Sequence, residues 1–163
     1  MQSEDTLLSV AEADYGEHYR DHCLAMYQTY VESAEKISDR RHNANTFFLT
    51  INTALLGING YLQADGSGLL GLAALAGVVL SYTWYRLIKS YRSMNTAKFK
   101  VIHDIELRLP FSLYDAEWER LERGENPAVH TPFSKVEGWV PIVFMVLHSV
   151  AAIVIFGSHI YGT

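Results

Sequence analysis

The sequence predicts an all-α membrane protein that crosses the bilayer three times. Three stretches, residues 42–64, 66–85 and 138–163, contain no Asp, Glu, Lys or Arg. Each reaches the roughly 20 apolar-dominated residues that a membrane-spanning helix needs. All thirteen Lys and Arg residues lie outside these stretches. If the segment between the first two stretches is outside the cell, every basic residue falls on the cytoplasmic side, as the positive-inside rule requires.

The overall composition does not distinguish this arrangement from a soluble domain, because 49% hydrophobic residues fits both. The distribution of charge decides, since a helix of a soluble protein normally keeps a polar face. We expect the N-terminus in the cytoplasm and the C-terminus outside. The expected segments are a cytoplasmic N-terminal helical region (1–41), a first span (42–64), an outer turn (65–68), a second span (69–88), a second cytoplasmic helical region (89–137) and a third span (138–161).

The first two spans are expected to extend into a cytoplasmic antiparallel helical hairpin. No Gly or Pro interrupts residues 17–56, so one helix can run from the cytoplasm into the membrane. The second span continues as an amphipathic helix through Leu109, and Pro110 would end it. The short outer turn then makes the two helices antiparallel partners. Steps of four and three predict a coiled-coil-like seam on the first helix. Its residues are Tyr19, Cys23, Met26, Tyr30, Ser33 and Ile37.

A short helix and a loop are predicted before the third span. Asp115 can act as the N-cap of this helix, and Gly124 lies just past its expected end. The Pro-containing segment 126–132 is typical of a loop. Trp139 is placed to anchor the third span at the membrane interface.

Basic residues gather beside the first two spans. Such juxtamembrane clusters set topology and attract anionic lipid headgroups, and they do not indicate a nucleic-acid partner. The residues are Arg40 and Arg41 before the first span, and Arg86, Lys89 and Arg92 after the second.

The first span carries a row of polar residues, Asn45, Asn52 and Asn59, spaced by seven. An amide inside hydrocarbon needs a partner or water, because leaving it bare costs several kcal/mol. The common use of such a row is interhelical hydrogen bonding that fixes register. The alternative is that a ring of subunits uses these side chains to line a polar axial passage.

His148 is the ionisable residue near the middle of the third span. A neutral imidazole bonded to a neighbouring Asn, Ser or Thr is the expected state, and proton sensing is the alternative.

No catalytic motif is present: GxSxG, P-loop, GxGxxG and CxxC patterns are all missing. His18 and His22 are one helical turn apart, but without HExxH we interpret them as solvated or partner-facing histidines. We therefore expect no enzyme, no cofactor and no metal site. Cys23, the single cysteine, forbids an intramolecular disulfide.

Four parts of the chain resemble the RipA family of octameric bacterial membrane proteins. They are residues 33–55, residues 84–91 with 95–106, residues 114–118 and residues 139–141. The resemblance implies a homo-oligomer, an octamer, in the bacterial inner (cytoplasmic) membrane. It brings no settled activity and no established functional residues. A looser similarity, to the two-span SLATT domains thought to act as pore-forming effectors, is weakened here by the third span.

Three functions follow as hypotheses. The first is a gated pore or channel-like membrane effector whose cytoplasmic helices respond to a protein or small-molecule trigger. The alternative is a non-conducting scaffold that docks a cytoplasmic partner on the acidic, Tyr-rich N-terminal segment. A proton-coupled carrier or intramembrane enzyme built on His148 ranks last.

Overall fold

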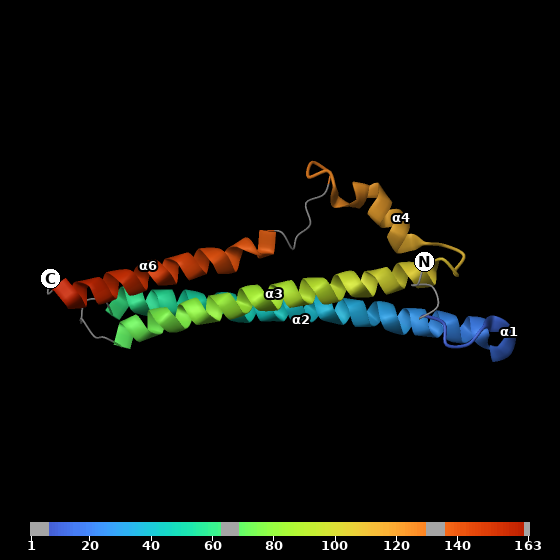
Figure 1. Cartoon of the computed structure of the whole chain (residues 1–163), viewed down its shortest axis with the longest axis horizontal. Coiled ribbons are helices and arrows are strands. Elements are labelled where there is room, and N and C mark those ends of the chain that lie inside the picture. The colour runs from blue at the N-terminus through green and yellow to red at the C-terminus, as the bar shows by residue number, and fades with distance from the viewer. Residues whose placement is uncertain (1–6, 63–68, 130–135, 162–163) are drawn as a thin grey trace. The chain divides into compact units, whose positions relative to one another are not determined.

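The computed structural model describes residues 7–62, 69–129 and 136–161, and these residues form helices and no strand. The all-α class predicted from the sequence is confirmed. The predicted outer turn, residues 65–68, lies outside the described residues. In chain order the elements are α1 (Glu12–Tyr15), α2 (Tyr19–Leu62), α3 (Leu69–Glu106), α4 (Leu113–Arg120), the 3-10 helix η2 (Glu122–Gly124) and α6 (Trp139–Tyr161) (Figure 1).

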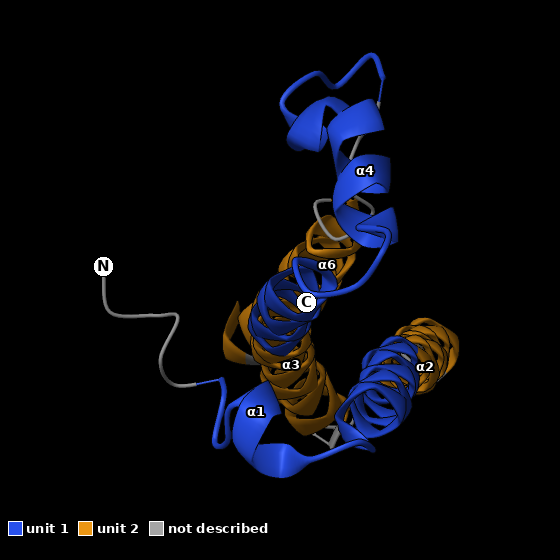
Figure 2. Ribbon diagram, turned by 90° about the vertical axis from the view of Figure 1, so that its right-hand side faces the viewer, with its two compact units in different colours: residues 1–38, 93–130 blue, residues 39–92, 131–163 orange. Residues whose placement is uncertain are grey.

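The chain divides into two compact units (Figure 2). Unit 1 comprises residues 1–38 and 93–130, and unit 2 comprises residues 39–92 and 131–163. Helices α2 and α3 each contribute one segment to each unit, and within a unit the two segments lie side by side in opposite directions (Figures 1 and 2). Unit 1 adds α4, and unit 2 adds α6. The division falls close to the predicted boundaries between cytoplasmic and membrane segments.

The length of α2 follows from its sequence. It has 44 residues, which corresponds to about 66 Å at 1.5 Å per residue. Its first glycine is Gly57 and it contains no proline, so nothing in the preceding part removes a backbone hydrogen bond. α3 has 38 residues and ends at Glu106, before Pro110.

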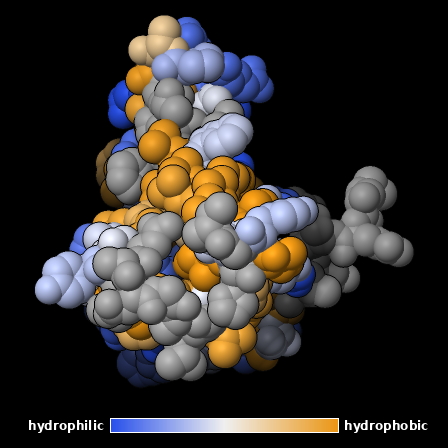
Figure 3. Space-filling view, turned by 90° about the vertical axis from the view of Figure 1, so that its left-hand side faces the viewer, coloured by the Kyte–Doolittle hydropathy of each residue, from blue (hydrophilic) through white to orange (hydrophobic). Residues whose placement is uncertain are grey.

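Two of the described helices are long and apolar enough to cross a bilayer, namely α3 and α6. The α2 segment of unit 2 is more polar, because its Asn and Thr residues lower its mean hydropathy. The count of three spans therefore stays a prediction. Hydrophobic side chains gather over the end of unit 2 where α6 finishes (Figure 3).

In unit 1 the packed face of α2 differs from the predicted seam. Met26 is 70% exposed, so its place in the seam was wrong. The residues directed at α3 are instead spaced by three and four from Tyr27, and they include Ala34 and Ile37, which are 3% and 6% exposed. On α3, Ile102 is fully buried. Ser33 still bonds α3 and Ile37 is buried, so the packed face departs from the predicted seam at Met26 and agrees with it farther along the helix.

Ser33, the weak point of the predicted seam, is bridged by a charged side chain. Lys98 Nζ on α3 donates to the Ser33 hydroxyl at 2.6 Å and lies 4.3 Å from the centre of the Tyr30 ring. The ammonium group thus gains both a hydrogen bond and a cation–π contact. This contact fixes the register of the two helices in unit 1.

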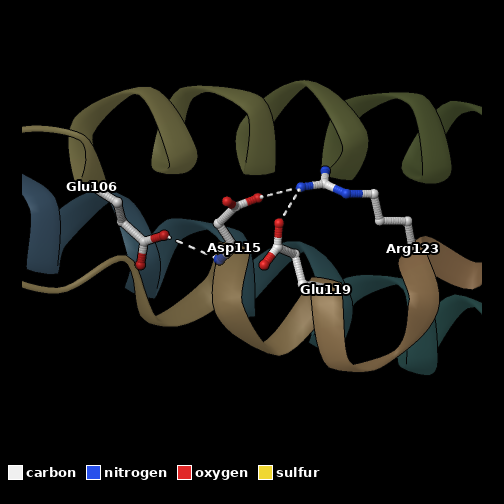
Figure 4. A network of polar contacts seen from close by, with 4 residues as sticks. All are labelled: Glu106, Asp115, Glu119 and Arg123. Atoms are coloured by element: carbon white, nitrogen blue, oxygen red, sulfur yellow. Dashed lines mark hydrogen bonds and ion pairs between the residues drawn. The ribbon is translucent and has the colours of Figure 1, made fainter.

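The start of α4 is capped from α3 and not by Asp115, so the predicted N-cap was wrong. Ser112 holds the N-cap position without a side-chain hydrogen bond. The Glu106 carboxylate instead accepts the backbone N–H groups of Tyr114 and Asp115, at 3.0 and 3.3 Å. Figure 4 shows the bond to Asp115. A carboxylate suits this place because the helix N-terminus carries partial positive charge. Asp115 is left to pair with Arg123 at 3.4 Å (Figure 4).

Glu106 also ties α4 to α2. Its side chain is 1% exposed and accepts a hydrogen bond from the Tyr27 hydroxyl at 3.0 Å. Burial and the neighbouring Glu106 carboxylate raise the pKa of Tyr27 from 10.0 to about 12. Only the neutral phenol can donate, so this contact stabilises unit 1 fully below pH 10. Its contribution is lost as the pH rises from 10 through about 12.

The substitution Glu106→Gln should lower the pKa of Tyr27, because it removes the negative charge that opposes ionisation of the phenol. Part of the shift should remain, since burial is its largest cause. The measurement is an NMR pH titration of tyrosine labelled with 13C at Cζ. Glu125→Gln, which changes an exposed carboxylate away from Tyr27, is the matched control and should leave the titration of Tyr27 unchanged. An identical titration curve for wild type and Glu106→Gln would show that the carboxylate has no such influence.

Candidate functional site

Unit 2 contains a row of buried and half-buried polar side chains, which we call the polar ladder. A seven-residue spacing keeps side chains on one helix face, with a drift of only about 20° per heptad. The structure turns this face of α2 toward α3, so that Asn52 and Asn59 are 0% and 5% exposed. The ladder comprises Arg41, Asn45, Asn52 and Asn59 on α2, Ser81 and Trp84 on α3, Glu137 just before α6 and His148 on α6.

At the end of the ladder nearest Glu137, the Asn45 amide of α2 joins α3 and the residues just before α6. Trp84 Nε1 donates to Asn45 Oδ1 at 2.8 Å, and Asn45 Nδ2 donates to Glu137 Oε1 at 3.2 Å. The other carboxylate oxygen of Glu137 lies 3.6 Å from Arg41 Nε, with the two side chains 12% and 20% exposed. Both charges are therefore largely removed from water and depend on each other.

Sequence reasoning found Arg41 and Asn45 but missed Glu137 and Trp84. A signal for Glu137 was present, because it is the last acidic residue before the third charge-free stretch. Glu137, just before the predicted third span, contributes little to the topology, because the positive-inside rule counts Lys and Arg. A pairing role was therefore the natural interpretation.

The other predicted juxtamembrane basic residues, Arg40, Arg86, Lys89 and Arg92, are exposed. Arg86 Nη1 lies 3.2 Å from the Tyr82 hydroxyl oxygen, and Lys89 Nζ lies 4.6 Å from the centre of the Tyr85 ring. Both contacts stay within α3. These side chains therefore leave their charge accessible, as contact with anionic headgroups requires.

Next to Asn45, an aromatic cluster fills the space between the helices. The Phe48 and Trp84 rings stack with centroids 5.9 Å apart, and the Phe144 ring of α6 lies 6.2 Å from Trp84. Ile88, 3% exposed, completes this core. The indole thus packs its apolar body while its N–H is bonded to Asn45, the arrangement that a buried Trp requires.

At the middle level, the polar atoms of Asn52 find partners within the chain. Ser81 Oγ donates to Asn52 Oδ1 at 2.8 Å, and Asn52 Nδ2 donates to the Phe48 backbone oxygen at 2.8 Å. The bond to Ser81 joins α2 to α3. Asn52 thus makes an interhelical bond of the kind expected for side chains that fix register.

At the upper level, His148 lies flat against a glycine of α3. A Cβ atom at Gly77 would come within 2.3 Å of His148 Nδ1, so no larger residue fits there without displacement of the ring. His148 is fully buried. Among the described residues neither ring nitrogen has a hydrogen-bond partner, so the expected bond to an Asn, Ser or Thr is not formed. The amide of Asn59 likewise has no partner among them.

The described residues contain no group of three or more His, Cys, Asp and Glu side chains that could hold a metal ion. His18 and His22 stack with ring centroids 5.9 Å apart, and His22 Nδ1 lies 2.8 Å from the Tyr15 hydroxyl. The ladder joins the polar groups of Asn45, Asn52, Ser81 and Trp84 between apolar helices, and it leaves those of Asn59 and His148 without a partner among the described residues.

Comparison with known families gives one match. Residues 24–157 match the model of the octameric membrane protein family (8xMP). The match includes segments of both units, all of α3 and most of α6. It confirms the resemblance seen in the sequence. Neither the curated proteins nor the solved structures gave a match.

A double-mutant cycle should show direct coupling between Asn52 and Ser81. Asn52→Leu leaves the Ser81 hydroxyl without its acceptor on α2, and Ser81→Ala removes the donor. We expect a coupling energy of about 0.6 kcal/mol, the average for hydrogen bonds between membrane helices. Unfolding of the detergent-solubilised protein measures it.

Thr83→Ala supplies the matched control for this cycle. The Thr83 hydroxyl bonds the Val79 backbone oxygen of its own helix at 2.9 Å, so its removal should not couple to Asn52→Leu. A coupling energy near zero for Asn52 and Ser81 would refute the interhelical bond.

Proposed function

The chain belongs to the octameric membrane protein family, and we propose that its assembly is a non-conducting scaffold that docks a cytoplasmic partner. As a member of that family it is a membrane protein that associates with copies of itself. The proposal places the assembly in the bacterial cytoplasmic membrane and assigns it no catalytic activity. Unit 2 would be the membrane part, and unit 1 would be the cytoplasmic part.

The proposed topology has three spans, formed by the unit 2 segments of α2 and α3 and by α6. The charge-free stretch 42–64 supports α2 as a span, although that segment is the most polar of the three. Trp139 at the start of α6 is 67% exposed, which suits an anchor at the interface. The exposed basic residues of α2 and α3 that flank the proposed spans support a cytoplasmic location of unit 1. These residues are Arg40, Arg86, Lys89 and Arg92.

Reporter fusions test this topology. A fusion at Met1 should be active in the cytoplasm, and one at Thr163 should be active outside, because the opposite orientation would translocate thirteen basic residues. A C-terminal reporter that is active in the cytoplasm would overturn the three-span arrangement. A fusion within residues 126–129 of unit 1 is the internal control and should report the same side as Met1.

The observation that carries the docking function is an acidic groove in unit 1, of about 760 Å³. Glu32 is 4.0 Å from Lys36, whereas Glu35 and Glu117 form no ion pair with any described residue. Carboxylates with aromatic rings beside them suit Lys or Arg side chains, through charge and cation–π contact. The groove is lined by Tyr27, Gln28, Val31, Glu32, Glu35, Leu113, Tyr114 and Glu117.

The polar ladder supports a non-conducting role. An axial passage lined by Asn52 requires an amide that faces other subunits, but this amide is fully buried and bonded inside its own chain. A gated pore is the second candidate. The observation that favours it is a different face of α2, where the hydroxyl-bearing Thr46, Thr50 and Thr53 are exposed.

Binding of a basic peptide tests the docking function. A fluorescent amphipathic helical peptide of Lys and Leu should bind the detergent-solubilised protein, and the pair of substitutions Glu35→Gln and Glu117→Gln should weaken its affinity. Two exposed charges are worth about 1.4 kcal/mol together, or about tenfold in Kd. Fluorescence anisotropy at low salt measures the affinity.

The control variant Glu125→Gln changes an exposed carboxylate outside the groove and should retain wild-type affinity. Equal affinity for the double variant and wild type would remove the groove as the docking site. Ion flux into liposomes that scales with reconstituted wild-type protein would contradict the non-conducting role.

A further inference from the structure

On the side of α2 that the rest of unit 2 leaves uncovered, Thr and Gly residues form a continuous row, flanked by the exposed side chains of Phe47, Leu49, Ile58 and Tyr61. We call this row the Thr/Gly seam. Its residues follow one another by four, three, four and three positions, a spacing that forms a straight line along a helix which packs against another. At 100° per residue it lies on the far side of α2 from Phe48 and Asn52. The seam consists of Thr46, Thr50, Thr53, Gly57 and Gly60, all of them exposed.

The uncovered faces of the other two helices are different. On α3 they expose large aliphatic side chains, such as Leu72 at 60% and Val79 at 63%. On α6 they expose Val146 at 57% and Ile153 at 71%. Large aliphatic side chains of this kind pack favourably against lipid tails. Among the described residues of unit 2, no exposed face of α3 or α6 carries such a row of Thr hydroxyls and Gly backbone.

The seam is built for close contact with another helix. The hydroxyls of Thr46 and Thr50 donate to backbone oxygens of their own helix, at 3.2 and 2.8 Å, so they need no water. A Cβ atom at Gly57 or Gly60 would meet nothing within 4 Å. Small residues in such a row let a second backbone approach, which is how helices associate where no hydrophobic effect drives them together.

Membership of an octameric family supplies the occupant. In a closed assembly each subunit gives part of its surface to its neighbours, and a lipid-covered seam would gain neither packing nor hydrogen bonds. We propose that the Thr/Gly seam of α2 is covered by a second copy of this chain and forms the subunit contact within the membrane. The inference rests on the proposed function in one respect, the placement of α2 in the bilayer.

Spin-label accessibility identifies what covers the seam. A nitroxide is attached at Thr53→Cys in a Cys23→Ser background, and the protein is reconstituted in liposomes. The matched control is Val146→Cys on α6. It lies at a similar depth, because His148 contacts Gly77, one turn from the Ser81 that bonds Asn52. We expect the label at position 53 to be shielded from both oxygen and a water-soluble nickel complex, and the control label to be open to oxygen.

Each other result overturns the inference in a recognisable way. A label at position 53 as open to oxygen as the control would show that lipid covers the seam. A label open to the nickel complex would show water there and would support the pore. Mass measurement of the solubilised wild type separates these outcomes from failure of the assembly itself, since a monomer would overturn both.

A second pair of variants covers the case in which the label itself disturbs the contact. Gly57→Leu fills the seam and should cause loss of the oligomer while each chain keeps its helical content by circular dichroism. Val146→Leu enlarges the exposed face of α6 and should leave the oligomer intact. An intact oligomer in Gly57→Leu would overturn the proposal.

Discussion

The bond between the Trp84 indole and the Asn45 amide is the interaction on which unit 2 depends. An indole N–H that is removed from water needs a hydrogen-bond acceptor. The amide that accepts this bond needs an acceptor for its own N–H groups in turn. Asn45 does so by reaching the Glu137 carboxylate, which in turn holds the Arg41 side chain. A single chain of dependence therefore joins α2, α3 and the start of α6. A shift of α2 by one turn would leave each of these groups without its partner.

The two units join their helices through buried polar groups of different kinds. Unit 2 uses neutral amides, a hydroxyl and an indole, and among its described residues the one close ion pair, Arg41 with Glu137, lies beside Asn45. Unit 1 uses charged groups instead, and Glu106 caps α4 while it accepts from Tyr27. A buried carboxylate needs several donors to offset its desolvation, and the free N–H groups at the start of a helix supply them. The buried carboxylate of unit 1 is thus satisfied by a helix N-terminus and a phenol, and the buried amide of Asn52 in unit 2 by a hydroxyl and a backbone oxygen.

Polar residues of α2 take two distinct roles that its sequence alone mixes together. Asn45 and Asn52 face inward and join the helices of one chain, whereas Thr46 and Thr50 face outward and bond their own backbone. This separation removes the Asn row as the main argument for an axial passage. It also explains why α2 is the least apolar of the three helices in unit 2, since both of its faces carry polar atoms. Asn45 and Asn52 serve contacts within the chain, and the Thr side chains of the Thr/Gly seam lie on the face proposed to contact a second copy.

Local properties of the sequence determined the helical class, the uninterrupted course of α2 and the extent of the last helix. Residues 138–161 were expected to be helical, and α6 spans Trp139–Tyr161, because charge-free runs and the positions of Gly and Pro act over neighbouring residues. The sequence also pointed to the correct face of α2 through the seven-residue spacing. It could not show which partner that face would meet.

The tertiary structure decided every contact that depends on how a helix is rotated about its axis. Met26 gave way to Tyr27 at the packed face, and the cap of α4 came from Glu106 on α3. Asn45 met Glu137, 92 residues away in the chain, a pairing that no local pattern encodes. His148 of α6 packs against Gly77 of α3 only because glycine has no side chain to keep the two helices apart. Such pairings follow from the simultaneous packing of several helices, and only the folded chain fixes them.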